Sequence, residues 1–190
     1  MPALFSNRIP EMKHSYSAVL AMVFSWSAAC ANAMDLTAAA GEDFVSANAG
    51  LNAGGLGLTA DWLYHDDLGY VAGLGLGLGV PLGSVLVTLG GKAMYVDLDS
   101  GDTGGALAMG GTVQWPLGEH FKLLGGAWYA PESLASGVGA YTEAMAGVRY
   151  NLTRQIGADL GYRYVKVEGE EGQPSAELAN GVYGGVSFSF

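Results

Sequence analysis

Residues 73–80 read GLGLGLGV, so that apolar side chains alternate strictly with glycine. Successive side chains of a β-strand point to opposite faces of a sheet, and an apolar residue at every second position is therefore typical of a strand. Similar alternation recurs as far as the last residue of the chain. We expect strands at the following ranges: 55–64, 69–80, 84–97, 106–115, 121–130, 140–151, 155–168 and 178–190.

Neither face of these segments is rich in charge. Between residues 106 and 115, one face carries Leu107 and Met109, whereas the other carries Ala108 and Thr112. Half of all residues are hydrophobic and only 14% are charged. A soluble β-sandwich also alternates, but it exposes polar residues on its outer faces. We therefore favour an all-β fold, a transmembrane antiparallel up-and-down β-barrel, and keep the sandwich as the alternative. Tilted strands need about 9–11 residues to cross a bilayer.

The connections between the expected strands are of two kinds that alternate along the chain. Pro81-Leu82-Gly83 and Pro116-Leu117-Gly118 predict tight turns that end the preceding strands. The connections at 99–105, 131–137 and 169–177 are longer and more acidic. Outer-membrane barrels have short turns on the periplasmic rim and longer loops outside. The pattern therefore predicts which rim faces out.

The number of strands depends on the segment that precedes residue 55. A hairpin of residues 35–41 and 44–51, turning at 41–43, would bring the total to ten strands. Its first segment is short for a full crossing, so eight strands with an N-terminal segment packed elsewhere is the alternative. Ten strands would keep both ends of the barrel on the periplasmic side.

Aromatic residues gather at the strand ends, where membrane barrels carry girdles at both interfaces. The expected girdle residues are Tyr95, Trp115, Phe121, Tyr129, Tyr150 and Tyr164. The chain then ends on a glycine followed by alternating apolar residues and a final aromatic. This ending resembles the C-terminal signal that the barrel-assembly machinery reads. Its residues are Gly185, Val186, Phe188 and Phe190.

Charged residues fall on the face of the strands that would line the lumen. In the hairpin of 140–151 and 155–168, a turn centred on Thr153 would place Glu143 opposite Arg163 and Arg149 diagonal to Asp159. An arginine that faced lipid at mid-depth would cost about 2–4 kcal/mol, so both pairs are expected inside. Inward parity also holds for two lysines, Lys92 and Lys122. We favour a structural filling of the lumen, with a polar path for solutes as the alternative.

The N-terminus has the order of a secretory signal peptide. Lys13 precedes an apolar stretch at 18–26, and Ala31-Asn32-Ala33 predicts cleavage before Met34. Residues 1–33 are thus expected to be an N-terminal extension and signal peptide, and residues 34–190 the barrel. Met12 is an alternative start, and lipidation at Cys30 is a rival to cleavage after Ala33.

No pattern in the sequence predicts catalysis. His65, Asp66 and Asp67 are consecutive, so neighbouring side chains point to opposite faces and do not converge. His120 is expected on the opposite rim, and Ser133 lacks the G-x-S-x-G elbow of a serine hydrolase. Acidic residues of the long loops could bind divalent cations or bridge to lipopolysaccharide phosphates, although plain solvation is favoured. They are Asp97, Asp99, Asp102, Glu168, Glu170, Glu171 and Glu177.

Four segments of the expected barrel carry a further signal: GYVAGLGLGLGVPLG (69–83), GGKAMYVDLDSGDTGGALAMGGTVQWPLG (90–118), YAPESLASGVGAYTEAMAGVRYNL (129–152) and GYRYV (161–165). These segments resemble the YfaZ family of outer-membrane proteins. The resemblance covers nearly all of the barrel and implies an outer-membrane location. It brings no catalytic or ligand-binding residues with it.

The sequence favours a small outer-membrane barrel with a structural or adhesive role. A narrow channel for small solutes is the alternative, and a hydrolase or acyltransferase at the rim is a third interpretation. We expect no enzyme activity, no cofactor and no bound metal. The expected partners are outer-membrane lipid, lipopolysaccharide and the barrel-assembly machinery. A net charge of −10 disfavours nucleic acid, and we expect a monomer.

Overall fold

A computed structural model describes residues 33–53, 55–169 and 174–190, without the side chains of residues 33 and 53. The predicted signal peptide, Cys30, the alternative start at Met12, and Glu170 and Glu171 lie outside these ranges. Within them, no helix is long and apolar enough to cross a membrane.

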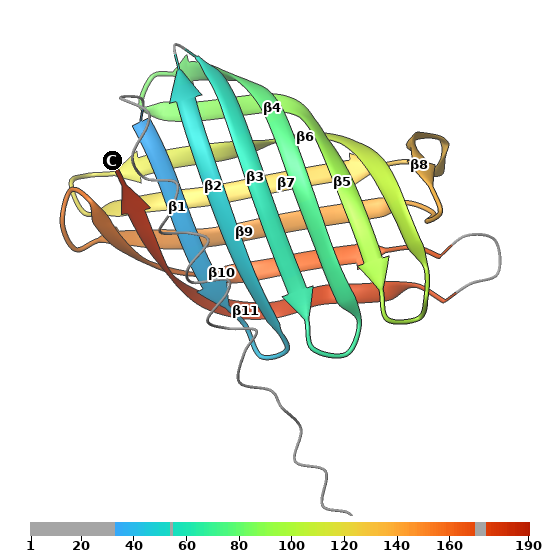
Figure 1. Cartoon of the computed structure of the whole chain (residues 1–190). Helices are drawn as coiled ribbons and strands as arrows, with labels where there is room; N and C mark the ends of the chain where they lie inside the picture. The colour runs from blue at the N-terminus through green and yellow to red at the C-terminus, as the bar shows by residue number, and fades with distance from the viewer. Residues whose placement is uncertain (1–32, 54, 170–173) are drawn as a thin grey trace, which may run out of the picture. The chain divides into compact units, whose positions relative to one another are not determined.

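The described chain is an antiparallel barrel in which each long strand pairs with the next (Figure 1). The pairing of β1 with β11 closes the ring, and the two-residue strand β8 pairs only with β6. The other ten strands form the wall, which confirms the all-β up-and-down barrel. The elements are β1 (Ala33–Ala40), β2 (Phe44–Ala53), β3 (Leu56–His65), β4 (Gly69–Leu82), β5 (Val85–Leu98), β6 (Thr103–Leu117), β7 (Phe121–Ala130), the 3-10 helix η1 (Glu132–Leu134), β8 (Ala135–Ser136), β9 (Tyr141–Asn151), β10 (Ile156–Val167) and β11 (Ala176–Ser189).

The hairpin that the sequence left open is part of the wall. β1 and β2 pair from Ala33 opposite Asn52 to Ala40 opposite Val45. Their turn is closed by Gly41, whose backbone N–H donates to the carbonyl oxygen of Phe44 at 2.8 Å. Ten strands are therefore correct. β1 is short, but its pairing with β11 still completes the ring.

The two rims of the barrel differ in their connections. We call one the turn rim; it carries the chain's C-terminus and the turns at 83–84, 118–120 and 152–155. The other is the loop rim, which carries 41–43, 66–68, 99–102, 131–140 and the described ends of the connection between β10 and β11, residues 168–169 and 174–175. The long connections all lie on the loop rim, as expected for the outward side.

The prediction that the proline turns end their strands is wrong at both positions. Pro81 still pairs with Leu86 inside the β4–β5 ladder, and Pro116 pairs with Lys122. Gly83 begins the turn with φ of +64°. A two-residue hairpin favours a positive φ at its first central position, because this matches the twist of the strands. The turn therefore begins after Leu82.

The predicted register of the β9–β10 hairpin is also wrong, by two residues. Arg149 lies directly opposite Asp159, and Glu143 lies opposite Val165 rather than Arg163. The cause is the turn, in which the Thr153 hydroxyl oxygen accepts the backbone N–H of Ile156 at 2.9 Å. This hydrogen bond closes a turn that contains four residues, 152–155. A shift of two residues preserves parity, so each side chain keeps its predicted face.

The outer surface carries the apolar face of the strands. Leu74, Leu76 and Leu78 are 69%, 53% and 63% exposed, which suits side chains that lie in lipid. Of the six expected girdle aromatics, Tyr95, Tyr129 and Tyr164 point outward toward the loop rim. Trp115, Phe121 and Tyr150 point outward at the turn rim, where the Phe121 and Tyr150 rings lie 5.1 Å apart.

Four outward aromatics of the loop-rim girdle were absent from the predicted set: Trp62, Tyr64, Tyr70 and Tyr162. The Trp62 and Tyr64 rings stack with centroids 6.0 Å apart, and those of Tyr70 and Tyr95 lie 6.1 Å apart. The alternation of side chains along their strands could have predicted that these four residues face outward. The barrel therefore has an aromatic girdle near each rim, with the leucine ladders between them.

Candidate functional site

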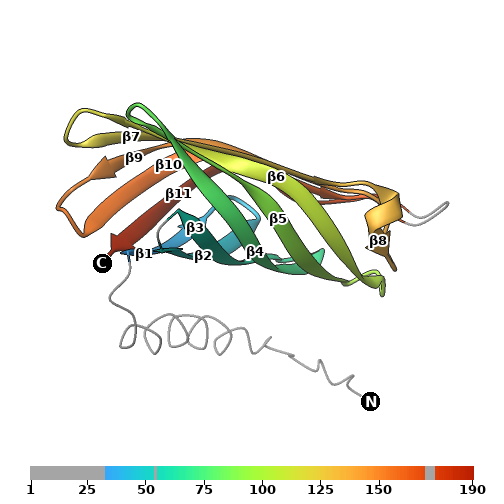
Figure 2. The same cartoon turned by 90° about the horizontal axis from the view of Figure 1, so that it is seen from above.

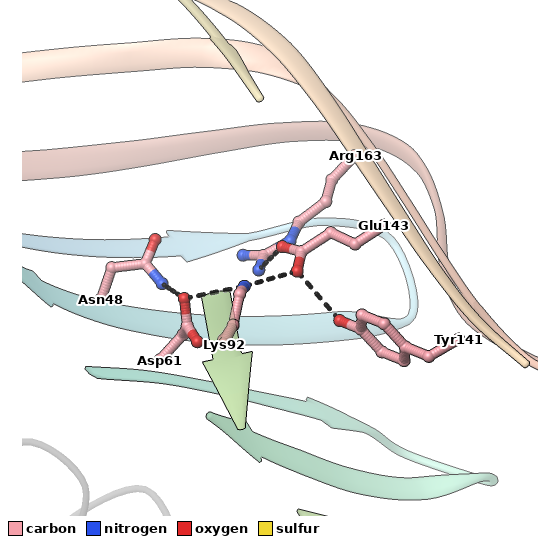
Figure 3. A network of polar contacts seen from close by, with 6 residues as sticks. All are labelled: Asn48, Asp61, Lys92, Tyr141, Glu143 and Arg163. Carbon is pink, nitrogen blue, oxygen red and sulfur yellow. Dashed lines mark hydrogen bonds and ion pairs between the residues drawn. The ribbon is translucent and has the colours of Figure 1, made fainter. Parts of the chain in front are cut away.

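The chemically rich part of the molecule is the lumen, where Glu143 of β9 holds three partners (Figure 3). Its Oε1 accepts from Arg163 Nη2 at 2.6 Å. Its Oε2 accepts from Lys92 Nζ at 2.7 Å and from the Tyr141 hydroxyl at 2.9 Å. All four residues are buried. The expected pair of Glu143 and Arg163 is thus part of a larger group that connects β5, β9 and β10, which we call the Glu143 cluster.

Lys92 extends the Glu143 cluster across the lumen to β3. Its Nζ also donates to Asp61 Oδ1 at 3.2 Å and lies 5.0 Å from the centroid of the Trp128 ring. Asn48 of β2 donates to the same Asp61 oxygen at 3.5 Å. A Cβ at Gly73 would overlap the Asp61 carboxylate, so glycine at this position makes room for the ion pair.

A second group surrounds Arg149 near the turn rim. Arg149 forms a bidentate pair with Asp159, through Nε to Oδ1 at 2.7 Å and Nη2 to Oδ2 at 2.8 Å. Its Nη1 donates to Asp35 at 2.9 Å, and its Nη2 also donates to Thr37 at 2.9 Å. Asp35 accepts from the Ser189 hydroxyl at 2.8 Å. We call these residues the Arg149 cluster; they connect β9 and β10 to the β1–β11 seam.

The sequence analysis did not single out Asp35 and Asp61 as lumen residues. Both lie on the inward parity of their strands, beside residues such as Thr37 and Leu63. Parity was therefore the signal that could have found them. With them, the charges that face the lumen in the described residues balance, with four cations and four carboxylates. The cations are Lys92, Lys122, Arg149 and Arg163, and the carboxylates are Asp35, Asp61, Glu143 and Asp159.

Lys122 is placed apart from both clusters. It occupies an inward position of β7, half-buried, opposite Arg149 on β9 and Pro116 on β6. Among the described residues it forms no salt bridge, unlike Lys92. Of the two predicted lumen lysines, the fold therefore brings only Lys92 into a cluster.

An apolar layer fills the lumen between the Glu143 cluster and the loop rim. Its members lie on the strands beyond the charged residues, except for Val138 in the connection before β9, and each is at most 2% exposed. They are Val96, Val138, Tyr141, Val165, Val167 and Leu178. A β-bulge between Val165 and Lys166 adds a residue to β11, so that both Leu178 and Ala179 are buried. The layer makes the loop-rim half of the interior a hydrophobic core.

The opposite end of the lumen is open to solvent. Thr59 has inward parity on β3, yet it is exposed. The Asp35 side chain is 47% exposed although it pairs with Arg149. Figure 2 shows the strands of the two walls farther apart toward the turn rim than near β8. Inward side chains are therefore solvent-exposed toward the turn rim and buried at the Glu143 cluster and the apolar layer.

The residues considered for catalysis do not form a site. His65 Nδ1 accepts the backbone N–H of Asp67 at 3.1 Å, which closes the turn between β3 and β4. His120 stacks on Tyr150 at the turn rim, with ring centroids 5.9 Å apart. Ser133 is an exposed residue of η1. Within the described ranges, no three His, Cys, Asp or Glu residues lie where they could hold a metal ion together.

Comparison with known proteins gives the same family as the resemblance of the sequence segments. The family model described as YfaZ precursor matches residues 12–190. Outer membrane protein YfaZ of Escherichia coli (strain K12) is 42% identical over 164 residues, which cover 85% of this chain and 91% of that protein. The chain belongs to the YfaZ family. This YfaZ-family protein is an outer-membrane β-barrel, and its predicted location is confirmed.

Solved structures resemble the YfaZ-family chain more weakly. An anion-selective porin from Comamonas acidovorans has a TM-score of 0.40 and 12% identity, over 77% of this chain and 49% of its own. The outer membrane protease OmpT from Escherichia coli has a TM-score of 0.46 and 10% identity, over 84% and 97%. Neisserial surface protein A has a TM-score of 0.31 and 16% identity, over 83% and 95%. Similarities at this level support no transfer of function.

Proposed function

We propose that this YfaZ-family protein is a structural outer-membrane barrel that does not conduct solutes. The apolar layer carries this proposal. Val96, Val165 and Val167 are each at most 1% exposed and come from two strands on different sides of the lumen. A hydrophobic constriction excludes water and therefore ions. The solvent-exposed inward side chains near the turn rim are the feature that would favour a channel, but beyond them lie the buried clusters and this layer.

The charges of the lumen support the same role. Small barrels fill their interior with side chains, and each buried charge here other than Lys122 has an opposite charge within 3.2 Å. Buried ion pairs specify which strands meet, since a shifted pairing would leave a charge unpaired. In this proposal the clusters hold the wall in one register, and the barrel requires no enzymatic activity.

The loop rim gives the proposed barrel a strongly acidic outer end. Its only described lysine, Lys166, is paired with Glu168 at 3.0 Å. An acidic surface repels lipopolysaccharide phosphates unless divalent cations bridge the two. Any contact of this rim with lipopolysaccharide would then depend on calcium or magnesium. The described acidic residues of the rim are Glu42, Asp43, Asp66, Asp67, Asp97, Asp99, Asp102, Glu132, Glu168 and Glu177.

Planar-bilayer recording of the refolded protein tests the non-conducting role. A heat-modifiable gel shift first establishes that the inserted protein is folded. The wild type should show no discrete conductance steps, and the triple variant Val96→Ser, Val165→Ser and Val167→Ser should show them. A variant with Leu76→Ser on the lipid face is the control for a general effect of the substitutions. Reproducible steps in the folded wild type would refute the proposal and favour the channel.

A further inference from the structure

A small cavity lies between the Glu143 and Arg149 clusters. Its volume is about 60 Å³, and residues of six strands line it. A cavity needs about 10–15 Å³ to hold one water, so this one has room for a small ligand. Its polar lining comprises Thr37, Ser46, Asn48, Arg149, Asp159, Arg163 and Tyr183.

One residue that lines the cavity, Arg163, has a buried N–H donor without an acceptor among the described residues. Arg163 is only 6% exposed, and its Nε has no hydrogen-bond partner among the described residues. Its Nη2 is used by Glu143. A buried donor left unpaired costs about 1–3 kcal/mol, and more when it is charged. Arg163 therefore requires an acceptor that the described chain does not supply.

Tyr183 presents a second polar group to the same cavity. It is 6% exposed, and within the described part of the chain its hydroxyl makes no hydrogen bond. A Cβ added at Gly147 or at Gly161 would lie 2.9 or 2.7 Å from the hydroxyl oxygen. Two glycines thus make room for a hydroxyl that can donate into the cavity.

The hydrogen-bond donors of the lining decide what kind of ligand fits. The charged residues of the lining are Arg149, Arg163 and Asp159, and both arginines are also paired from outside the lining, with Asp35 at 2.9 Å and with Glu143 at 2.6 Å. Asp159 already accepts two hydrogen bonds from Arg149, and its side chain is 2% exposed. Glu143, which pairs with Arg163, lies outside the lining. The lining is thus rich in hydrogen-bond donors, while the charges of its two arginines are balanced by the carboxylates that pair with them.

We propose that this cavity binds one monovalent, monatomic anion, with chloride as the physiological ligand. The anion would accept from Arg163 Nε, which has no acceptor among the described residues, and from the Tyr183 hydroxyl. The small volume of the cavity favours a monatomic ion over a larger one. The site lies on the turn-rim side of the apolar layer, so the proposal does not depend on whether the barrel conducts.

Crystals of the refolded full chain soaked in bromide give the direct test. An anomalous peak between Arg163 and Tyr183 is the expected result. Thermal unfolding in detergent, in sodium chloride or sodium gluconate at equal ionic strength, gives the second. Chloride should raise the Tm in a saturable manner, whereas gluconate should not, because it is too large for the cavity.

The variant Tyr183→Phe removes one proposed hydrogen bond and changes little else. It should weaken the apparent chloride affinity about three- to tenfold, as expected for one hydrogen bond. Tyr129→Phe is the matched control, because Tyr129 is 53% exposed on the lipid face. The proposal is overturned if bromide gives no anomalous peak and the Tm is the same in both salts, since the cavity would then hold water only.

Discussion

Arg149 and Asp159 lie directly opposite each other on β9 and β10 and form a bidentate ion pair at 2.7 and 2.8 Å. Each end of the pair is held further, since Arg149 also donates to Asp35 on β1 and to Thr37. The pair therefore joins β9 and β10 to the β1–β11 seam, where the barrel closes.

Removal of either partner of this pair should destabilise the barrel by about 3–5 kcal/mol, because the other charge would stay buried without its partner. The double variant Arg149→Met and Asp159→Leu should cost much less than the sum of the single variants. Urea unfolding in lipid vesicles measures the coupling. Lys166 and Glu168, at the exposed loop rim, form the control pair and should show additive effects. Additive effects at Arg149 and Asp159 would contradict a coupled pair.

Glu143→Gln should cost about 3–5 kcal/mol of unfolding free energy, since Lys92 and Arg163 would lose the carboxylate that they share. The substitution keeps the size of the side chain, so lost charge and not lost volume causes the effect. Glu132→Gln, at an exposed position of η1, should leave the unfolding curve unchanged. Equal urea midpoints for the two variants would show that the cluster contributes no stability.

Gly90→Ala and Gly91→Ala should differ although the residues are neighbours on β5. A Cβ at Gly90 would overlap the backbone carbonyl of Leu76 on β4, whereas a Cβ at Gly91 would meet nothing closer than 3.7 Å. Overpacking costs about 1–3 kcal/mol, so only Gly90→Ala should lower the unfolding free energy. Two variants as stable as the wild type would show that β4 and β5 can separate without cost.

Deletion of Phe190 should lower the amount of folded protein in the outer membrane. Its backbone N–H donates to Met34 at 2.9 Å and its carbonyl accepts from Met34 at 3.2 Å, so its loss opens the end of the seam. Membrane fractionation with the heat-modifiable shift measures the effect. Phe190→Tyr retains both backbone bonds and the aromatic ring and should assemble normally. Normal levels of the deletion variant would argue against a role of the last residue in assembly.

Parity was the most dependable information in the sequence. Leu74, Leu76 and Leu78 face outward and Lys92 faces the lumen, as their alternation indicated. The register was harder to predict, because shifts of two residues keep every side chain on its face. The Thr153 hydroxyl then decided between two hairpins with the same parity, through hydrogen bonds that no periodicity reveals.

The sequence by itself favoured an outer-membrane barrel over a sandwich and determined which side chains share a face of each strand. It could do so because a strand has a period of two and because charge in lipid is costly. Only the tertiary structure decided that Glu143 serves both Lys92 and Arg163, and that an apolar layer closes one end of the lumen. These contacts join strands far apart in the chain, and closure of β1 onto β11 sets the distances between them.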